Sequence, residues 1–517
     1  MSTHTATQQA RAERRSTYHE ADVVVVGAGV FGCAAAYALA QQGRSVLLLE
    51  RWMKQPDRIV GELLQPGGVE ALRKLGLGHC IEGIDSIVCN GFDVIYFGDQ
   101  VVIPYPKIQG LMGGFANGTA NGTANGEANG QANGQTNGHA NGTAHSKEKD
   151  PRPQGRSFHH GRFVQKLRET CLAHPNITVV ETEAVSTVKG EHTSEILGVE
   201  TRTVDPATGQ KVPDYFFGQL TIVADGYASI FRKKYIDRTP IVRSKFYALE
   251  LIDADLPQPN FGHVVLGTAS PVLLYQIGTH ETRALIDVPL ECPAASTAAG
   301  GVRGYITNVV IPSLPPQVQP AFRAALERDN KIPRSMPNSW LPPSKQSHAG
   351  LLVLGDAMNM RHPLTGGGMT VALNDVVILS SLLAPSQIPN LGDSAAVLRA
   401  MDTFHWQRKS LTSIINVLAQ ALYSLFSAAD PNLAKLQRGC FAYFRKGITD
   451  DPMGLMGGLI HRPFVLAYHF FAVAFLAIWI DAKATGLWNI PVVLWNSISL
   501  LWTACVVFLP VMYKEVF

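Results

Sequence analysis

A glycine-rich turn near the N-terminus constrains the fold of this chain more than any other feature. Four consecutive valines lead directly into Gly-Ala-Gly-Val-Phe-Gly, in which Gly27, Gly29 and Gly32 form a GxGxxG pattern. An alanine-rich segment follows, and a second short apolar run ends in Glu50. This order of elements predicts a βαβ unit built on buried parallel strands: a β-branched run, a tight turn, a helical segment and another short apolar run.

The spacing of these residues indicates the ligand of the unit. Gly27 permits the tight turn, Gly29 lets backbone N–H groups approach a pyrophosphate at the helix N-terminus, and Gly32 lets the helix pack on the strand. Glu50 lies about twenty residues further on, where an acidic side chain accepts a hydrogen bond from an adenosine ribose. The unit is therefore predicted to bind a dinucleotide, either FAD or NAD(P).

A second glycine-rich stretch, GDAMNMRHPLTGGGMT at residues 355–370, favours FAD. Asp356 follows an apolar run, so it is expected at the end of a strand, where its carboxylate can bind a hydroxyl of a ribityl chain. The next helix is expected to begin near Met369, and the positive end of its dipole would stabilise a reduced, negatively charged flavin ring. A plain helix cap is the alternative role for Asp356. The sequence holds one GxGxxG, so a second complete nucleotide-binding fold for NADPH is not evident.

The C-terminal part of the chain is strongly apolar and predicts association with a membrane. Residues 463–480 and 490–512 carry no formal charge, and a span needs roughly 20 apolar residues. Only residues 481–489 separate the two runs, which favours a hairpin with both ends on one side. The charges that flank the hairpin are mostly basic, namely His461, Arg462 and Lys514. The alternative is a pair of helices buried in a soluble domain.

Bulk composition favours a membrane-associated protein and argues against some other classes. The chain is 16% charged, whereas ordinary soluble proteins are near a quarter charged. A net charge of +3 gives no support for a nucleic-acid partner. Seven scattered cysteines without a C-x-x-C pair indicate unpaired thiols in a reducing compartment and no metal site.

These patterns predict an α/β, Rossmann-like FAD-binding domain, an α+β substrate domain and a C-terminal helical membrane hairpin. The FAD-binding domain is expected to be discontinuous, with segments at 21–110, 150–235 and 345–390. The substrate domain is expected at 236–344, and the helical region, which contains the hairpin, at 391–517. A disordered tail is predicted at 1–20 and a flexible Ala/Asn/Gly insertion at 111–149.

Further motifs resemble the squalene monooxygenase (squalene epoxidase) family, which belongs to the FAD-dependent monooxygenases of the hydroxybenzoate hydroxylase class. The motifs are GELLQPGGVEALRKLGLG (61–78), IPYP (103–106), SFHHGRFVQKLR (157–168), RSMPNSWLPP (334–343) and the stretch 355–370. The resemblance covers about residues 21–110 and 150–517. It implies epoxidation of squalene to (S)-2,3-oxidosqualene with O2 in sterol (ergosterol) biosynthesis, and the low-complexity insertion suggests a fungal member.

The resemblance also implies which residues form the site. Beside the residues named above, the cofactor-binding set contains Val30, Phe31, Arg51, Arg58, Leu63, Arg168 and the backbone near Ala184. The implied substrate pocket contains Gln65, Phe92, Tyr275, Pro363 and Leu364. The alternatives are solvated surface charges for the two arginines Arg58 and Arg168, and ordinary core positions for the pocket residues other than Gln65.

One position departs from the family pattern. Phe92 stands where the family often has a tyrosine after Asn-Gly, which predicts that Gln65 lacks a hydroxyl partner. No catalytic side chain is expected, because the oxygen would be activated on the flavin and the protein would only exclude water and hold the alkene. His159, His160 and His362 are accordingly interpreted as structural hydrogen-bonding residues.

The resemblance further implies electrons from NADPH, delivered by NADPH–cytochrome P-450 reductase. The expected location is the endoplasmic reticulum membrane, including microsomes and lipid droplets, with the catalytic domain on the cytosolic side. Two alternatives remain open from the sequence. One is an epoxidase of another polyprenyl chain in secondary metabolism, and the other is a flavin-binding membrane protein without turnover.

Overall fold

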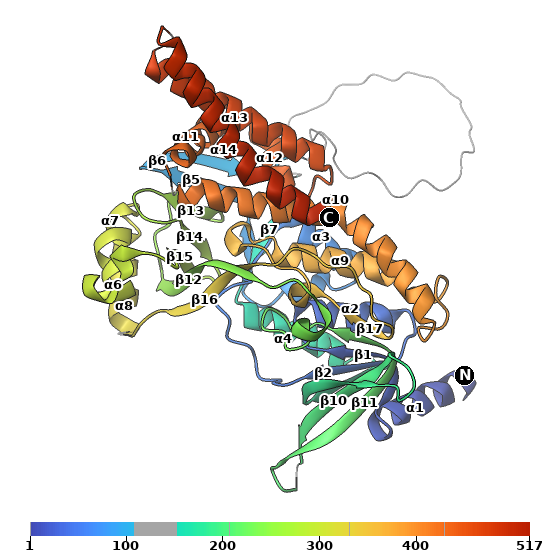
Figure 1. The fold of residues 1–517 in the computed structure, drawn as a ribbon. Coiled ribbons are helices and arrows are strands. Elements are labelled where there is room, and N and C mark those ends of the chain that lie inside the picture. Colours follow the sequence, from blue (N-terminus) through green and yellow to red (C-terminus); the bar gives the residue numbers. More distant parts are fainter. Residues whose placement is uncertain are drawn as a thin grey trace, which may run out of the picture.

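The structure is a computed structural model that describes residues 2–107, 152–205, 207–329, 331–428, 430–486 and 488–516. The insertion predicted at 111–149 lies outside the described residues. Two seven-stranded sheets and a group of C-terminal helices make up the architecture (Figure 1).

The first sheet carries the N-terminal glycine turn. Its strands lie in the order β8-β2-β1-β11-β10-β9, and β17 also pairs with β11. The strands are β1 (Glu20–Val26), β2 (Val46–Glu50), β8 (Ile177–Glu181), β9 (Glu183–Lys189), β10 (Ile196–Val204), β11 (Lys211–Val223) and β17 (Leu351–Val353). The pairs β1–β2, β2–β8, β1–β11 and β11–β17 are parallel, whereas β9, β10 and β11 form an antiparallel ribbon. Burial of the parallel strands explains their uninterrupted apolar runs.

Four helices pack near the parallel strands and position the site. They are α2 (Val30–Gln41), α3 (Pro66–Lys74), α4 (His160–Leu172) and α9 (Gly368–Leu382), and their apolar side chains share one core with the sheet. The short α5 (Arg232–Tyr235) follows β11.

The N-terminal residues form helix α1 (Ser2–Thr17), where the sequence predicted a disordered tail. Arg15 anchors the helix: its guanidinium donates to Ser45 Oγ at 3.0 Å, to Thr178 Oγ1 at 2.9 Å and to the carbonyl of Pro175 at 2.7 Å. Polar contacts of this kind hold the helix to the sheet edge, and an apolar pattern that would predict the helix is not evident in residues 2–17.

The second sheet contains the predicted substrate region together with two strands from earlier in the chain. Its order is β16-β12-β15-β14-β13-β5-β6. The strands are β5 (Gly91–Tyr96), β6 (Asp99–Pro104), β12 (Ile241–Ile252), β13 (Gly262–Leu266), β14 (Val272–Gln276), β15 (Glu281–Pro289) and β16 (Arg334–Trp340). The helices α6 (Gly301–Tyr305), α7 (Ile311–Ser313) and α8 (Gln319–Asp329) pack beside it.

The boundary of the substrate region therefore differs from the sequence prediction. Strands β5 and β6 were assigned to the FAD-binding domain, but β5 pairs in parallel with β13, so that Phe92 lies opposite Gly262. Sequence proximity to the glycine turn was misleading, because this pairing joins segments about 170 residues apart. A small third sheet, β3 (Leu63–Leu64), β7 (Gly155–Ser157) and β4 (Ile87–Cys89), completes the described strands.

The C-terminal region is helical. It contains α10 (Ser394–Ser427), α11 (Pro431–Arg445), α12 (Asp450–Met456), α13 (Pro463–Thr485) and α14 (Ile490–Val516). Helices α10, α13 and α14 are each long and apolar enough to cross a membrane. The most apolar part of α10 is 72% buried, whereas those of α13 and α14 are 28% and 17% buried. The hairpin α13–α14 thus presents an uncovered apolar surface, and α10 is a core helix.

Helix α14 has two different faces. One face is buried at every third or fourth residue and contains Leu500, Ala504, Phe508, Val511 and Glu515. The other exposes large apolar side chains, among them Trp495, Ile498, Trp502, Val506 and Leu509. The C-terminal end of the helix lies beside α10, and the hairpin extends past α11 (Figure 1).

Candidate functional site

A cleft between the two sheets collects most of the residues that the sequence singled out. It encloses about 1410 Å³ of empty space, part of it open to solvent. Three groups form its walls: the β1–α2 turn, the loop from Gly355 to Met369, and side chains of the second sheet.

The β1–α2 turn presents bare backbone to this cleft. Gly27 has a φ of +102°, and a Cβ there would lie 2.5 Å from the carbonyl oxygen of Ala224. A Cβ on Gly32 would lie 1.8 Å from the carbonyl oxygen of Gly27, so helix and turn are in direct contact. Gly29 caps α2 without a side-chain hydrogen bond, and a Cβ there would meet no atom of a non-adjacent described residue within 4 Å. The first N–H groups of α2 are therefore accessible to an anionic group.

Two charged side chains hold this turn from behind. Glu50 Oε2 accepts from the backbone N–H of Ala28 at 2.8 Å and lies 3.3 Å from a guanidinium nitrogen of Arg168. Arg168 Nε donates to the carbonyl of Ala28 at 2.9 Å, and the side chain is only 4% exposed. Arg168 is thus a buried support of the turn, which excludes the alternative of a solvated surface charge.

The second glycine loop brings another helix N-terminus to the same cleft. Gly355 and Gly366 have φ values of +64° and +61°, which only glycine adopts without strain. Gly367 caps α9 without a side-chain hydrogen bond, and a Cβ on Gly368 would have open space within 4 Å as far as the described, non-adjacent residues are concerned. Asp356 and Met369 both line the cleft.

Arg232 fixes the start of this loop. Its guanidinium donates to the carbonyls of Asp356 and Ala357 at 2.9 and 2.8 Å and to the carbonyl of Tyr227 at 2.9 Å. No sequence pattern indicated that Arg232 would hold this loop. The side chain of Asp225 accepts from the N–H of Ile230 at 3.1 Å, which is a local cap.

These observations fit FAD. Two helix N-termini without side-chain caps, two glycines with open space above them and an acidic side chain all face one cleft. Of the predicted cofactor-binding residues, Gly29, Val30, Phe31, Arg58, Leu63, Asp356 and Met369 line it. Gly27 belongs to the turn itself and Gly32 to the first turn of α2. Glu50 and Arg168 lie directly behind the turn and hold Ala28.

Two predicted cofactor residues lie away from the cleft wall. The guanidinium of Arg51 lies over the ring of Trp52, 4.2 Å from its centroid, next to Glu50. Ala184 lies on β9 opposite Thr201 and packs against the core of the first sheet. Neither residue lines the cleft, so their contacts with the adenosine end stay predictions.

The opposite wall of the cleft is mainly apolar. Phe92, Tyr275, Pro363 and Leu364 line it, together with two residues that the sequence did not single out, Leu273 and Leu285. The residues of this wall that come from the second sheet are Phe92, Leu273, Tyr275 and Leu285. Phe92 reaches the wall because its strand, β5, belongs to that sheet. The wall is suited to a ligand without polar groups.

The charges in this wall are paired with each other. Arg283 Nε and Nη2 donate to Glu62 at 2.8 and 2.9 Å, a bidentate contact, and Tyr275 Oη lies 3.4 Å from Glu62 Oε2. Burial raises the pKa of Glu62, although Arg283 opposes the shift. Glu62 belongs to the GELLQ motif, but no sequence signal marked Arg283 as its partner.

Gln65 has a hydroxyl partner, so the expectation drawn from Phe92 was wrong. Tyr105 Oη donates to Gln65 Oε1 at 2.5 Å, and Gln65 Nε2 donates to the carbonyl of Thr365 at 2.6 Å. Gln65 is fully buried and lies behind the glycine loop, not on the cleft wall. Tyr105 belongs to the IPYP motif, but the distance between the two residues along the sequence does not predict that Tyr105 pairs with Gln65.

Two of the three motif histidines, His160 and His362, make structural contacts, whereas Nε2 of His159 is buried without a hydrogen-bond partner among the described residues. His160 Nδ1 lies 2.8 Å from the carbonyl oxygen of Gly61, and burial lowers the pKa of His160 to about 3. His362 stacks on Tyr423 at 4.0 Å and accepts from the N–H of Leu364; burial likewise lowers its pKa to about 3. Both rings are therefore neutral over the physiological pH range.

Comparisons with known proteins agree with this geometry. The squalene epoxidase family model matches residues 217–495, and the FAD-dependent oxidoreductase model matches residues 22–54. A squalene epoxidase of Gibberella zeae is 58% identical over 99% of both chains. The squalene monooxygenase of Mus musculus is 38% identical and covers 99% of this chain and 81% of its own.

Solved structures show the same fold at low identity. The p-nitrophenol 4-monooxygenase of Pseudomonas putida has a TM-score of 0.60 at 17% identity and covers 87% of this chain and 97% of its own. A Klebsiella pneumoniae protein solved with FAD and uric acid has a TM-score of 0.56 at 17% identity and covers 86% and 96%. The predicted fold class is thereby confirmed.

Proposed function

The chain belongs to the squalene epoxidase family of FAD-dependent monooxygenases, and we propose that its cleft holds FAD and squalene against each other for epoxidation. The observation that carries the proposal is the asymmetry of the cleft. One side is glycine backbone with two helix N-termini, and the other is an apolar wall whose charges are paired internally.

For the cofactor, the β1–α2 turn would take the pyrophosphate and Glu50 with Arg51 the adenosine end. Asp356 would accept a hydrogen bond from the ribityl chain, and the N-terminus of α9 near Met369 would face the flavin ring. Bound FAD, once reduced, supplies the activated oxygen. The residues of the chain bind the cofactor, fix its orientation and exclude water.

For the substrate, the apolar wall would hold the hydrocarbon. Squalene has no polar group, so its position must come from the shape of the wall and from burial of apolar surface. Phe92, Tyr275 and Leu364 would keep a terminal alkene in the cleft, and the Glu62–Arg283 pair would fix Tyr275. The expected product is 2,3-oxidosqualene for sterol biosynthesis.

We propose that the electrons come from NADPH through a separate reductase of the NADPH–cytochrome P-450 reductase type. The support is that the sequence contains one GxGxxG and that the family resemblance implies this partner.

We further propose that the hairpin α13–α14 lies in the endoplasmic reticulum membrane, with the catalytic domain on the cytosolic side. Its exposed apolar surface and the flanking His461, Arg462 and Lys514 support this placement. The same membrane would supply squalene, which is too apolar to reach the cleft through water.

Reconstitution tests the proposed electron path. Purified full-length protein is incorporated into lipid vesicles with FAD, squalene and NADPH, and product is measured with and without added reductase. Epoxide should form at a substantial rate only with the reductase. If NADPH alone reduces the flavin at the rate of turnover, the chain takes electrons directly and the partner proposal fails.

A further inference from the structure

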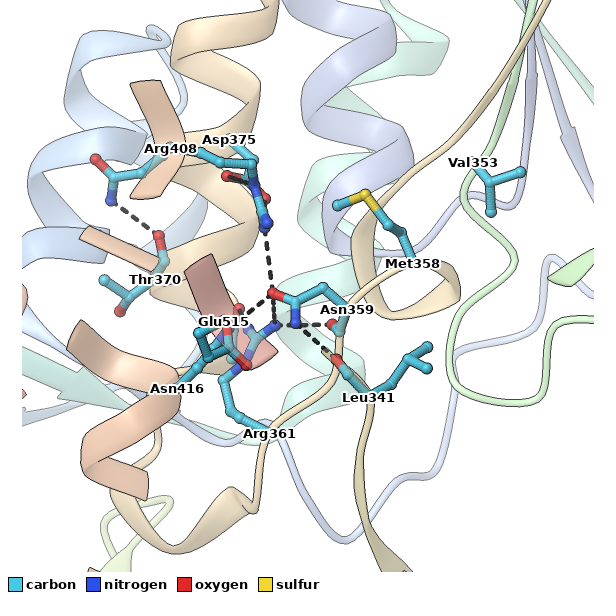
Figure 2. Close-up of polar contacts among 12 residues, drawn as sticks. Leu341, Val353, Met358, Asn359, Arg361, Thr370, Asp375, Arg408, Asn416 and Glu515 are labelled. Carbon is cyan, nitrogen blue, oxygen red and sulfur yellow. Dashed lines mark hydrogen bonds and ion pairs between the residues drawn. The ribbon is translucent and has the colours of Figure 1, made fainter. Parts of the chain in front are cut away.

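The side chain of Asn359 connects the second glycine loop to helix α10 and to the segment that follows β16. Its Oδ1 accepts from Arg361 at 2.9 Å, from Asn416 at 3.1 Å and from Arg408 at 3.2 Å, and its Nδ2 donates to the carbonyl of Leu341 at 2.7 Å. Figure 2 shows these residues converging on Asn359. All of these hydrogen bonds are buried, where charged donors are strong and losses are costly.

Arg361 carries this network into the cleft. Its Nη2 also donates to the carbonyl of Asn359 at 2.7 Å, and its Nη1 donates to the carbonyl of Gly368, the first residue of α9, at 3.2 Å. Arg361 lines the cleft, and its buried Nε has no hydrogen-bond partner among the described residues. Movement of Arg361 would therefore move the helix N-terminus that faces the proposed flavin.

The far end of the network is Glu515, near the end of membrane-facing helix α14. Its carboxylate is fully buried, and it accepts from Asn416 Nδ2 at 2.8 Å and from Trp340 Nε1 at 3.3 Å. The backbone carbonyl of Glu515 also accepts from Lys409. Since Asn416 donates to both Glu515 and Asn359, it bridges the C-terminal helix and the glycine loop.

Charge balance gives Glu515 a second role in the network. Arg361 and Arg408 are both buried, and Asp375 pairs with Arg408 through contacts of 2.6 and 2.9 Å (Figure 2). Asp375 thus compensates one of the two guanidinium groups. Burial lowers the pKa of Arg361, and the charges of Asp356, Asp375 and Glu515, in that order of size, oppose the shift, so Glu515 supplies part of the compensation of this guanidinium.

We propose that Glu515 is a positioning residue for the flavin site. Through Asn416 and Asn359 it fixes Arg361 and the loop that leads to α9, and its charge adds to that of Asp356 and Asp375 in offsetting the buried guanidinium beside the cleft. Helix α14, whose other face is exposed and apolar, thereby completes the cofactor site with its last turn. This role rests on the proposed FAD site, and the C-terminal helix would provide part of the stability of that site.

The first test compares two full-length variants of α14. Glu515→Ala removes the carboxylate, and Leu500→Ala removes a fully buried apolar side chain from the same helix without touching the network. FAD affinity is measured by quenching of flavin fluorescence, at a temperature where circular dichroism shows both variants folded. Glu515→Ala should weaken FAD binding about tenfold, and Leu500→Ala should change it less than about twofold.

The matched pair separates positioning from general stability. If both variants weaken FAD binding equally, or neither does, Glu515 only anchors the helix and the inference is overturned. If the wild-type protein itself binds no FAD, the proposed cofactor site is wrong. This outcome differs from failure of the inference about Glu515, in which the wild-type protein binds FAD normally.

A second variant keeps the inference testable if Glu515→Ala does not fold. Glu515→Gln retains an oxygen that accepts from Asn416 but removes the charge, so FAD affinity should return to within about threefold of wild type. The midpoint potential of the bound flavin should rise, because Arg361 then has one compensating carboxylate fewer and stabilises the reduced, anionic ring more strongly. An unchanged potential in Glu515→Gln overturns the charge role of Glu515 and with it the inference.

Discussion

The two glycine loops of the cleft perform similar tasks but are supported in opposite ways. The β1–α2 turn is held by Glu50 and Arg168, which lie on the neighbouring strand and helix of the first sheet. The loop at residues 355–368 is held by Arg232, by Gln65 and by the Asn359 network, which reaches α10 and α14. The first support is contained in one βαβ layer, and the second draws on the whole chain.

This difference teaches where each half of the proposed cofactor site is vulnerable. Damage to the first turn should come from its own residues, because its contacts are near. Damage to the second loop should also come from remote changes, including changes in the apolar hairpin α13–α14. The predictions below test this contrast, beginning with the largest expected effect.

Removal of residues 461–517 should have the largest effect. The truncation deletes α13 and α14, leaves apolar faces of α10 and α11 uncovered, and removes Glu515. The truncated protein should leave the membrane fraction after carbonate washing and should lose most of its FAD, although the first glycine turn is intact. Unchanged membrane partition would place the anchor elsewhere, and unchanged FAD content would contradict the dependence of the second loop on α14.

Two alanine substitutions should distinguish folding from cofactor contact within the first turn. Gly32→Ala would force a Cβ to within 1.8 Å of the Gly27 carbonyl oxygen, so it should lower the thermal stability of the apoprotein and abolish FAD binding. Gly29→Ala meets no protein atom, so it should leave apoprotein stability near wild type and weaken FAD binding at least about tenfold. Equal loss of apoprotein stability in both variants would show that Gly29 is not a ligand-facing position.

Asp356→Ala should weaken the cofactor site at the second loop. The loss of a charged acceptor costs roughly 1.5–3 kcal/mol, which corresponds to about 10- to 150-fold in the dissociation constant of FAD. Asp356→Asn is the control, because it keeps an oxygen acceptor and should lose less affinity. A fully flavinated and fully active Asp356→Ala enzyme would remove Asp356 from the site.

Tyr105→Phe should give the smallest effect. It removes the donor to Gln65 Oε1 and should lower the free energy of unfolding by about 1 kcal/mol. Because Gln65 Nε2 still donates to Thr365, the loop should stay in place and FAD affinity should change less than about threefold. A large loss of FAD affinity measured by fluorescence titration would show that Tyr105 acts on the loop directly.

The sequence predicted features that depend on local pattern. The valine run, the three glycines and Glu50 specify a βαβ unit whatever follows them, and two uncharged apolar runs predict the paired helices α13 and α14. The fold class follows from these features.

The remaining features depend on contacts between distant segments. No spacing reveals that Phe92 joins β13, that Tyr105 reaches Gln65, or that Arg15 anchors α1. In the sequence Glu515 is one acidic residue after an apolar run, and only the packing of α14 on α10 gives it Asn416 as a partner.

The most direct test of the central claim is the mass and structure of the product formed under isotopically labelled oxygen gas. Full-length protein in lipid vesicles receives FAD, squalene, NADPH and the reductase, and the extracted lipid is examined by mass spectrometry and NMR. Two glycine loops that hold one FAD against an apolar wall predict squalene that carries one labelled oxygen as a terminal 2,3-epoxide. Unlabelled product, oxygen placed elsewhere than on the terminal alkene, or no oxygen transfer despite bound and reducible FAD would contradict the account.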